Sequence, residues 1–209
     1  MKYYSNDADV LRYEPKLFME LFPASQVIAR GSGAVLGGTS LTKTGEDFTA
    51  SGVGAGNVVY INSAAAGIEG VFEVTGVEAN DRIGVSVLRA DESDAAVAVG
   101  NASDVQYRIA TLGPQAREVY IALRQYFGLR DEQLGDSWEL RQCSTYAVIA
   151  SIYASAATEL TSNDAYWRKS LYYQKLFARA RERAAAVVDN NADGSADTHV
   201  PTAAKIRRD

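Results

Sequence analysis

The pattern of apolar and polar residues changes near Gly113. Before this point, glycine, valine and threonine are frequent, and turn residues recur every few positions. After it, alanine, leucine, arginine and glutamate dominate, and apolar residues recur three and four positions apart. The first pattern is typical of strands and the second of helices. The sequence therefore predicts an α+β protein, in which a small antiparallel β barrel or sandwich is inserted into a bundle of about three long helices plus a short N-terminal helix.

The predicted boundaries follow these changes in pattern. They are an N-terminal helical segment of the bundle over residues 1–26, the β module over 27–112, the helical bundle over 113–188 and a C-terminal tail over 189–209. Within the first segment, residues 13–23 predict a short helix, because Pro15 suits its first turn and Pro23 ends it. Its apolar residues share one face that must pack against another element: Leu17, Phe18, Leu21 and Phe22.

Short alternating runs characterise the β module. Strands are predicted over residues 58–61, 70–77, 83–88 and 105–109. Asn80 and Asp81 predict a turn between the second and third of them. The glycine-rich residues 31–38 predict a loop or an extended arm, and the small, acidic residues 90–101 predict an exposed loop.

Three helices are expected after Gly113. Pro114 suits a first helical position, and the first helix places Ala116, Val119, Tyr120, Leu123 and Phe127 on one apolar face. The spacing of Asp136 and Glu139 predicts a capping box for a second, central helix that reaches about Leu160. The third helix should begin near Asn163 or Asp164. Its apolar stripe is Tyr166, Ser170, Tyr173, Phe177, Ala180, Ala184 and Val187.

Composition excludes several classes of function. Of the 209 residues, 47% are hydrophobic and 22% charged, as in an ordinary folded domain. The net charge of −5 disfavours a general nucleic-acid binder. The N-terminus is not expected to be a signal peptide, and the longest apolar stretch, residues 146–157, is too short to span a bilayer.

The residue types of catalytic sites are scarce. Cys143 is the only cysteine and His199 the only histidine, so neither an internal disulfide nor a Cys/His zinc cluster can form. Cys143 is expected in the core of a helix, and His199 in the tail has no nucleophile beside it. The glycine-rich segments lack the residues of a phosphate loop. The sequence therefore predicts a structural or interaction protein with no cofactor rather than an enzyme; a hydrolase whose site has no recognisable motif is a remaining alternative.

A polar segment after the third helix partly fits a calcium loop. Oxygen-bearing residues at alternate positions and a glycine suit a hard cation, and here they are Asp189, Asn191, Asp193, Gly194 and Asp197. The pattern fails at its twelfth position, where Val200 replaces a bidentate glutamate. A turn rich in Asp, Asn and Gly after a helix is the alternative interpretation.

The third helix carries charge of mainly one sign. Residues 165–188 contain six basic residues, Arg168, Lys169, Lys175, Arg179, Arg181 and Arg183, and a single acid, Glu182. This segment is therefore +5, and the rest of the chain is −10. A solvated face is one interpretation. An acidic neighbour is the other: a second subunit, the chain's own β module, or nucleic acid. The tail adds Lys205, Arg207 and Arg208.

Two regions resemble known virion proteins. Residues 172–181, followed by an Asp/Asn/Gly turn and a basic tail, resemble the head–tail adaptor (connector) proteins of tailed bacteriophages. Residues 45–53, 56–61 and 70–74 resemble a small β module that is common in phage virion proteins.

The resemblance implies a structural component of the virion neck, made in the host cytoplasm. It implies a ring, commonly of twelve copies, that binds beneath the portal, extends the DNA channel without sequence-specific binding, and provides a platform for the tail. Lys205, Arg207 and Arg208 are then expected to contact the portal. The expected subunit contact is the basic helix, through Arg168, Lys169, Lys175, Arg179 and Arg183.

A second hypothesis belongs to a different class. The β module would recognise carbohydrate or protein on a virion or cell surface, as a binding module. Deleting residues 27–111 would separate the two hypotheses, because it would remove receptor binding and leave head–tail joining intact only under the second.

Overall fold

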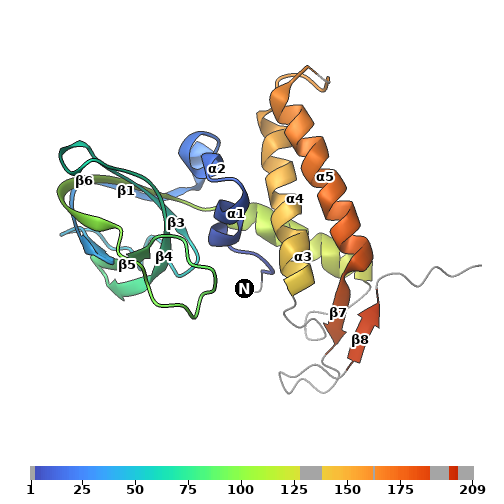
Figure 1. Ribbon diagram of the computed structural model, residues 1–209, viewed down its shortest axis with the longest axis horizontal. Helices are drawn as coiled ribbons and strands as arrows, with labels where there is room; N and C mark the ends of the chain where they lie inside the picture. Colours follow the sequence, from blue (N-terminus) through green and yellow to red (C-terminus); the bar gives the residue numbers. More distant parts are fainter. Residues whose placement is uncertain (1–2, 128–137, 162, 189–197, 202–209) are drawn as a thin grey trace, which may run out of the picture. The chain divides into compact units, whose positions relative to one another are not determined.

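The chain is divided into two compact units in the computed structural model (Figure 1), which describes residues 3–127, 138–161, 163–188 and 198–201. One unit, here called the barrel unit, is Asn6–Leu112. The other, the helical unit, combines Met1–Ser5 with Gly113–Asp209. The protein is therefore a mixed α+β protein, as predicted.

A closed antiparallel barrel forms the main part of the barrel unit. Its strands run in the order β1-β2-β5-β4-β3-β6, and β6 closes the sheet against β1. Closure pairs the edges that an open sheet would expose. The strands are β1 (Val27–Gly38), β2 (Ser40–Thr42), β3 (Val58–Ser63), β4 (Ile68–Ala79), β5 (Arg82–Ser86) and β6 (Gly100–Ala110).

Alternation of side chains fills the barrel. On β6, Val105, Tyr107 and Ile109 are buried in the barrel core, whereas Gln106 is exposed and Arg108 is half-buried. This period of two is the one that strand geometry dictates. The four predicted strands and the turn at Asn80 are confirmed, although the strand predicted over residues 83–88 ends at Ser86. The module is a barrel rather than a sandwich.

The prediction of a loop or arm over residues 31–38 was wrong, because these residues belong to β1. A Cβ at Gly31 would lie 3.0 Å from the Tyr107 ring, so glycine lets β1 approach the inward-pointing tyrosine. The pairing register shifts between Gly31 and Ala34, where Gly33 has a φ of 70°. The glycines thus serve close packing and a β-bulge within a strand.

The N-terminal helices also differ from the prediction. They are α1 (Asp7–Tyr13), begun by a capping box between Asn6 and Asp9, and α2 (Lys16–Glu20). The sequence predicted only one helix here and assigned it to the bundle, whereas both helices belong to the barrel unit. Hydrogen bonds to the barrel explain the assignment: the Ala8 N–H donates to the Gly56 carbonyl at 3.0 Å, and the Arg108 guanidinium donates to the Phe18 carbonyl at 3.1 Å.

The helical unit contains α3 (Gly113–Phe127), α4 (Trp138–Ala156) and α5 (Ala165–Arg183). The predicted faces are confirmed at their centres: Ala116, Tyr120 and Leu123 on α3, and Ser170, Tyr173 and Ala180 on α5, are buried. Small residues bring α4 and α5 together, since the Ser170 hydroxyl donates to the Ala150 carbonyl at 2.9 Å. The predicted start of this helix near Asn163 or Asp164 is confirmed, and Asp164 caps it through a hydrogen bond from the Trp167 N–H at 2.9 Å.

The third helix ends earlier than the sequence predicted. The helix stops at Arg183, and β7 (Ala185–Val188) pairs antiparallel with β8 (Thr198–Pro201), with Val187 opposite His199. Val187 is therefore not part of the helical stripe, and residues 198–201 are a strand within the predicted tail. Strand pairing is a contact between distant residues, so the helical spacing of Val187 could not reveal it.

Replacement of Gly31 tests the packing of β1. We expect Gly31→Ala to lower the free energy of unfolding by about 1–3 kcal/mol, because its Cβ would meet the Tyr107 ring. Gly37→Ala is the matched control in the same strand, where a Cβ would have no atom within 4 Å. Urea unfolding of both variants measures the difference, and equal losses would contradict this account of Gly31.

Candidate interaction surfaces

A buried carboxylate ties α1 to the barrel. Asp7 accepts a hydrogen bond from the Leu112 N–H at 2.7 Å and another from the Asn57 side-chain amide at 2.8 Å. Burial raises the pKa of Asp7 to about 6, although these hydrogen bonds act in the opposite direction. Both carboxylate oxygens have partners inside the barrel unit, so the geometry gives Asp7 a structural role.

A second buried acid holds the connection between β5 and β6, residues 87–99, which we call the acidic loop. Glu73 is 1% exposed and accepts hydrogen bonds from the Arg89 guanidinium at 2.7 and 3.2 Å. The same guanidinium donates to the carbonyls of Glu92 at 2.7 Å and Asp94 at 2.8 Å. Arg12 donates to the Arg89 carbonyl at 3.1 Å. Two arginines thus anchor the acidic loop, Arg89 through its side chain and Arg12 through the Arg89 carbonyl.

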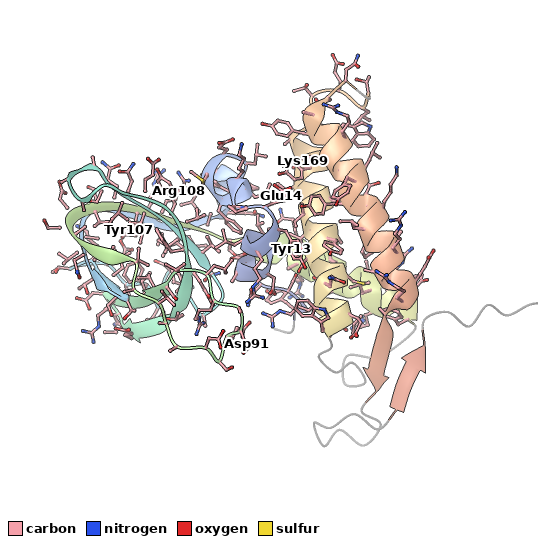
Figure 2. The ribbon with its side chains drawn as sticks, viewed as in Figure 1. Tyr13, Glu14, Asp91, Tyr107, Arg108 and Lys169 are labelled. Atoms are coloured by element: carbon pink, nitrogen blue, oxygen red, sulfur yellow. The ribbon has the colours of Figure 1, made fainter. Side chains whose placement is uncertain are left out.

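The acidic loop presents charge on a fixed backbone. Residues 90–98 are exposed, as predicted, but residues 100 and 101 already belong to β6. Asp91 accepts hydrogen bonds from the Ser93 N–H and hydroxyl, and Asp94 accepts one from the Asp91 N–H at 2.9 Å. Beside them, Val87 and Val97 are 43% and 53% exposed. Figure 2 labels Asp91 on this loop.

Charge is divided unequally between the two units. Residues 6–112 contain seven Lys and Arg against fourteen Asp and Glu, which is a net charge of −7. The remaining residues contain fourteen basic and twelve acidic residues, which is +2. One chain therefore carries two units of opposite net charge. The barrel unit of one copy can attract the helical unit of another copy electrostatically.

The outward side of α5 is the main basic surface among the described residues. Arg168, Lys175, Arg179 and Arg183 are exposed, and no carboxylate of the described residues forms an ion pair with them. Leu171 and Tyr172, which are 38% and 57% exposed, lie on the same side of the helix. We call these six residues the α5 basic face.

Two other cations of α5 are engaged within the helical unit. Lys169 donates a hydrogen bond to the Tyr153 hydroxyl at 2.8 Å, and its Nζ lies 4.7 Å from the centre of the Tyr153 ring. Arg181 stacks on the rings of Tyr126 and Phe177 at 4.2 and 5.0 Å. Such cation–π contacts hold the charge beside an aromatic ring. Lys169, labelled in Figure 2, was expected at a subunit contact, and the structure assigns its ammonium this internal partner.

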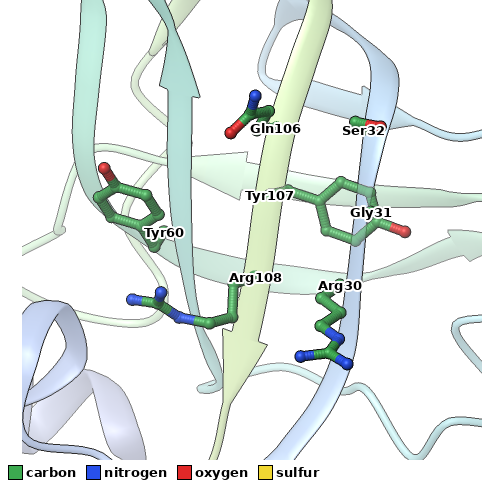
Figure 3. A pocket seen from close by; sticks show the side chains of 7 residues that line it. All are labelled: Arg30, Gly31, Ser32, Tyr60, Gln106, Tyr107 and Arg108. Atoms are coloured by element: carbon green, nitrogen blue, oxygen red, sulfur yellow. The ribbon is translucent and has the colours of Figure 1, made fainter.

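The barrel wall carries an open hollow of about 480 Å³ across β1, β6 and β3 (Figure 3). Arg108 is its most constrained side chain: the guanidinium lies 4.0 Å from the Phe22 ring centre and 4.9 Å from that of Tyr60. Burial lowers the pKa of Arg108. Strand register places Arg30 and Tyr60 opposite Arg108. No sequence motif marks this hollow, although the alternation along β6 places Gln106 and Arg108 on one side of the strand.

The remaining candidates from the sequence are Cys143, the calcium loop and the basic tail. Cys143 is buried, and burial raises the pKa of its thiol to about 12, which confirms a core residue. The calcium candidates Asp189, Asn191, Asp193 and Asp197 lie outside the described residues, as do Lys205, Arg207 and Arg208. Within the described ranges, no group of three or more His, Cys, Asp or Glu side chains is arranged to hold a metal ion.

Comparison with known proteins adds no family assignment. No protein-family model matches the chain, and neither a curated protein nor a solved structure gives a match. None of the helices in the described part of the chain has the length and apolar character required to cross a membrane.

Removal of Arg89 tests the buried ion pair. We expect Arg89→Ala to lower the free energy of unfolding by about 3–5 kcal/mol, because Glu73 would keep a buried charge without its partner. Arg82→Ala is the control, since the Arg82–Glu78 pair is exposed and should contribute less than about 1 kcal/mol. Denaturant unfolding measures both, and faster proteolysis within residues 87–99 should accompany the first change only.

The buried carboxyl of Asp7 should make stability depend on pH. Its raised pKa means that the protonated form is favoured in the folded state; this stabilisation is complete below the ordinary value of 3.8 and is lost as pH rises through about 6. Asp7→Asn cannot titrate. Between about pH 4 and pH 7, wild type should therefore lose up to about 3 kcal/mol relative to Asp7→Asn. Unfolding free energies of both proteins across this range measure the difference; a constant difference would contradict the burial of an ionisable group at this position.

Proposed function

We propose that this protein is a structural virion component, a head–tail adaptor that assembles into a ring beneath the portal. In this proposal α3, α4 and α5 form a helical bundle into which the barrel is inserted. The observation that carries the proposal is the α5 basic face: four exposed cations with two exposed apolar residues, on a chain whose other unit has a net charge of −7. Such a surface suits the joining of subunits.

Ring formation requires two different surfaces on each subunit. A head-to-tail contact between unlike surfaces closes into a ring when the rotation between subunits allows it. Opposite charge on the two units supplies unlike surfaces on one chain. The ring would be a homo-oligomer, a dodecamer if it follows the family that residues 172–181 resemble, and it would surround the DNA channel without reading sequence.

The segments behind the resemblance lie in both units. Residues 172–181 are part of α5, and Tyr172, Lys175 and Arg179 of the α5 basic face fall within them. Residues 56–61 and 70–74 include most of β3 and the centre of β4. Both units therefore have a role in the proposed function. The α5 helix forms the subunit contact, and the barrel is a structural part of the neck.

The position of the chain in an assembled particle tests the function. We expect electron cryomicroscopy of virions to place the barrel and α3–α5 at the head–tail junction, in several copies around the channel. Density for the chain elsewhere in the particle, or a single copy at the neck, would overturn the proposal.

Truncation after Pro201 tests the basic tail. The pairing of β7 with β8 means that the cut should follow β8, so that the pair is retained. We expect the shortened protein to keep its circular dichroism spectrum and melting temperature but to fail to join heads to tails, because Lys205, Arg207 and Arg208 are absent. In vitro complementation of adaptor-deficient heads measures joining. The full-length chain is the control, and unchanged joining would refute the portal role of these residues.

A second candidate function rests on the barrel-wall hollow. Tyr60, Gln106 and Arg30 offer an aromatic ring, an amide and a guanidinium around an open site, which suits a sugar or a peptide as ligand. Arg30→Ala combined with Gln106→Ala should then reduce adsorption of the particles to cells while head–tail joining persists. Normal adsorption of the double variant would remove this candidate.

A further inference from the structure

We propose that the α5 basic face of one copy binds the acidic loop of a second copy. This inference rests on the proposed function, because it names the partner surface for the subunit contact of the ring. It specifies a head-to-tail contact between the helical unit of one chain and the barrel unit of the next.

The α5 basic face has the layout of an interface. Arg168, Lys175 and Arg179 are seven and four residues apart, so they lie along one side of the helix. Between Arg168 and Arg183 the helix rises about 22 Å. Leu171 and Tyr172 add exposed apolar surface among these charges. Arginine and tyrosine are enriched where proteins meet, because they combine charge or a hydroxyl with apolar area.

The acidic loop complements this face in charge. Three of the four residues from Asp91 to Asp94 are acidic, and residues 90–99 contain no lysine or arginine. Val97 provides exposed apolar surface beside them. The exposed residues of the loop are thus mainly acidic or apolar, whereas those of the α5 basic face are basic or apolar.

The acidic loop is also ordered before any contact is made. Its ends are joined by a hydrogen bond from the Val87 N–H to the Val97 carbonyl at 3.1 Å. The Arg89 guanidinium holds the carbonyls of Glu92 and Asp94 from inside. A surface that is already ordered loses less conformational entropy on binding. By contrast, Glu20 and Glu69 are exposed acids of the barrel unit that lie singly on α2 and β4.

Site-specific cross-linking between separate chains tests the contact. One protein carries Tyr172→Cys and the other Ala96→Cys, and a short bis-maleimide is added to the mixture. Native Cys143 does not interfere, because it is buried. We expect a covalent heterodimer in several-fold higher yield than with Ala65→Cys, an exposed site on the β3–β4 hairpin outside the loop. Added salt should lower the yield, since the attraction is electrostatic.

Charge reversal shows whether the cross-link reports the proposed contact. Lys175→Glu in the Tyr172→Cys protein should reduce the yield several-fold. Lys16→Glu, which changes the net charge equally at an exposed site on α2, should leave it unchanged. A yield no higher than with Ala65→Cys, or equal effects of the two reversals, would overturn the proposal.

A chain with both cysteines separates the remaining occupant. If Tyr172→Cys/Ala96→Cys cross-links efficiently within a monomer while the mixed single variants do not react, α5 binds the loop of its own chain and the proposal fails. These experiments use purified protein, whereas the proposed function is tested in particles. A chain absent from the neck that still forms the heterodimer would overturn the function and leave the contact standing.

Discussion

Pairing of β1 with β6 is the constraint on which the barrel unit depends. It closes the sheet, and it runs the length of both strands, from Val27 opposite Ala110 to Gly38 opposite Gly100. The pairing requires β1 to pass over the Tyr107 ring, which fills the core below it. A side chain at residue 31 would separate the strands at that point, so the glycine-rich sequence of β1 follows from closure. The same strand β6 also pairs with β3, and the Asp7 hydrogen bond from Leu112 ties its end to α1.

Sequence patterns predicted the elements whose information is local. Alternation at residues 105–109 and helical spacing from Ala116 to Phe127 depend on neighbours in the chain, and both predictions held. The errors fell where a distant residue decides the structure. The glycine-rich residues 31–38 have the local composition of a loop, but pairing with β6 makes them a strand. Val187 has helical spacing, but its pairing with His199 places it in a strand. The N-terminal helices were assigned to the wrong unit for the same reason, since Gly56 and Arg108 hold them.

The candidate surfaces were predictable in part. The one-sign charge of α5 was visible in the sequence, but the structure divides its cations into two sets. Lys169 and Arg181 contact aromatic rings of the helical unit, and only the others form the α5 basic face. Similarly, residues 90–98 were recognised as exposed and acidic, whereas the alternation of β4 gave no sign that Glu73 is buried and paired with Arg89. The sequence therefore gives the number of charged residues, whereas packing decides which of them are exposed to a partner.

The strength of exposed charges bears on how such a ring would assemble. Individual surface ion pairs contribute little, typically less than about 1 kcal/mol, and salt weakens them further. A single contact between the α5 basic face and an acidic loop would therefore hold two free chains only weakly. A closed ring changes the balance, because its last contact forms between subunits already held together. Because each contact is weak, such subunits would stay apart in free solution. They would associate where a template, such as a portal ring, brings them together. The anchored acidic loop fits this scheme, since the Arg89–Glu73 pair stabilises its shape within each subunit before any neighbour arrives.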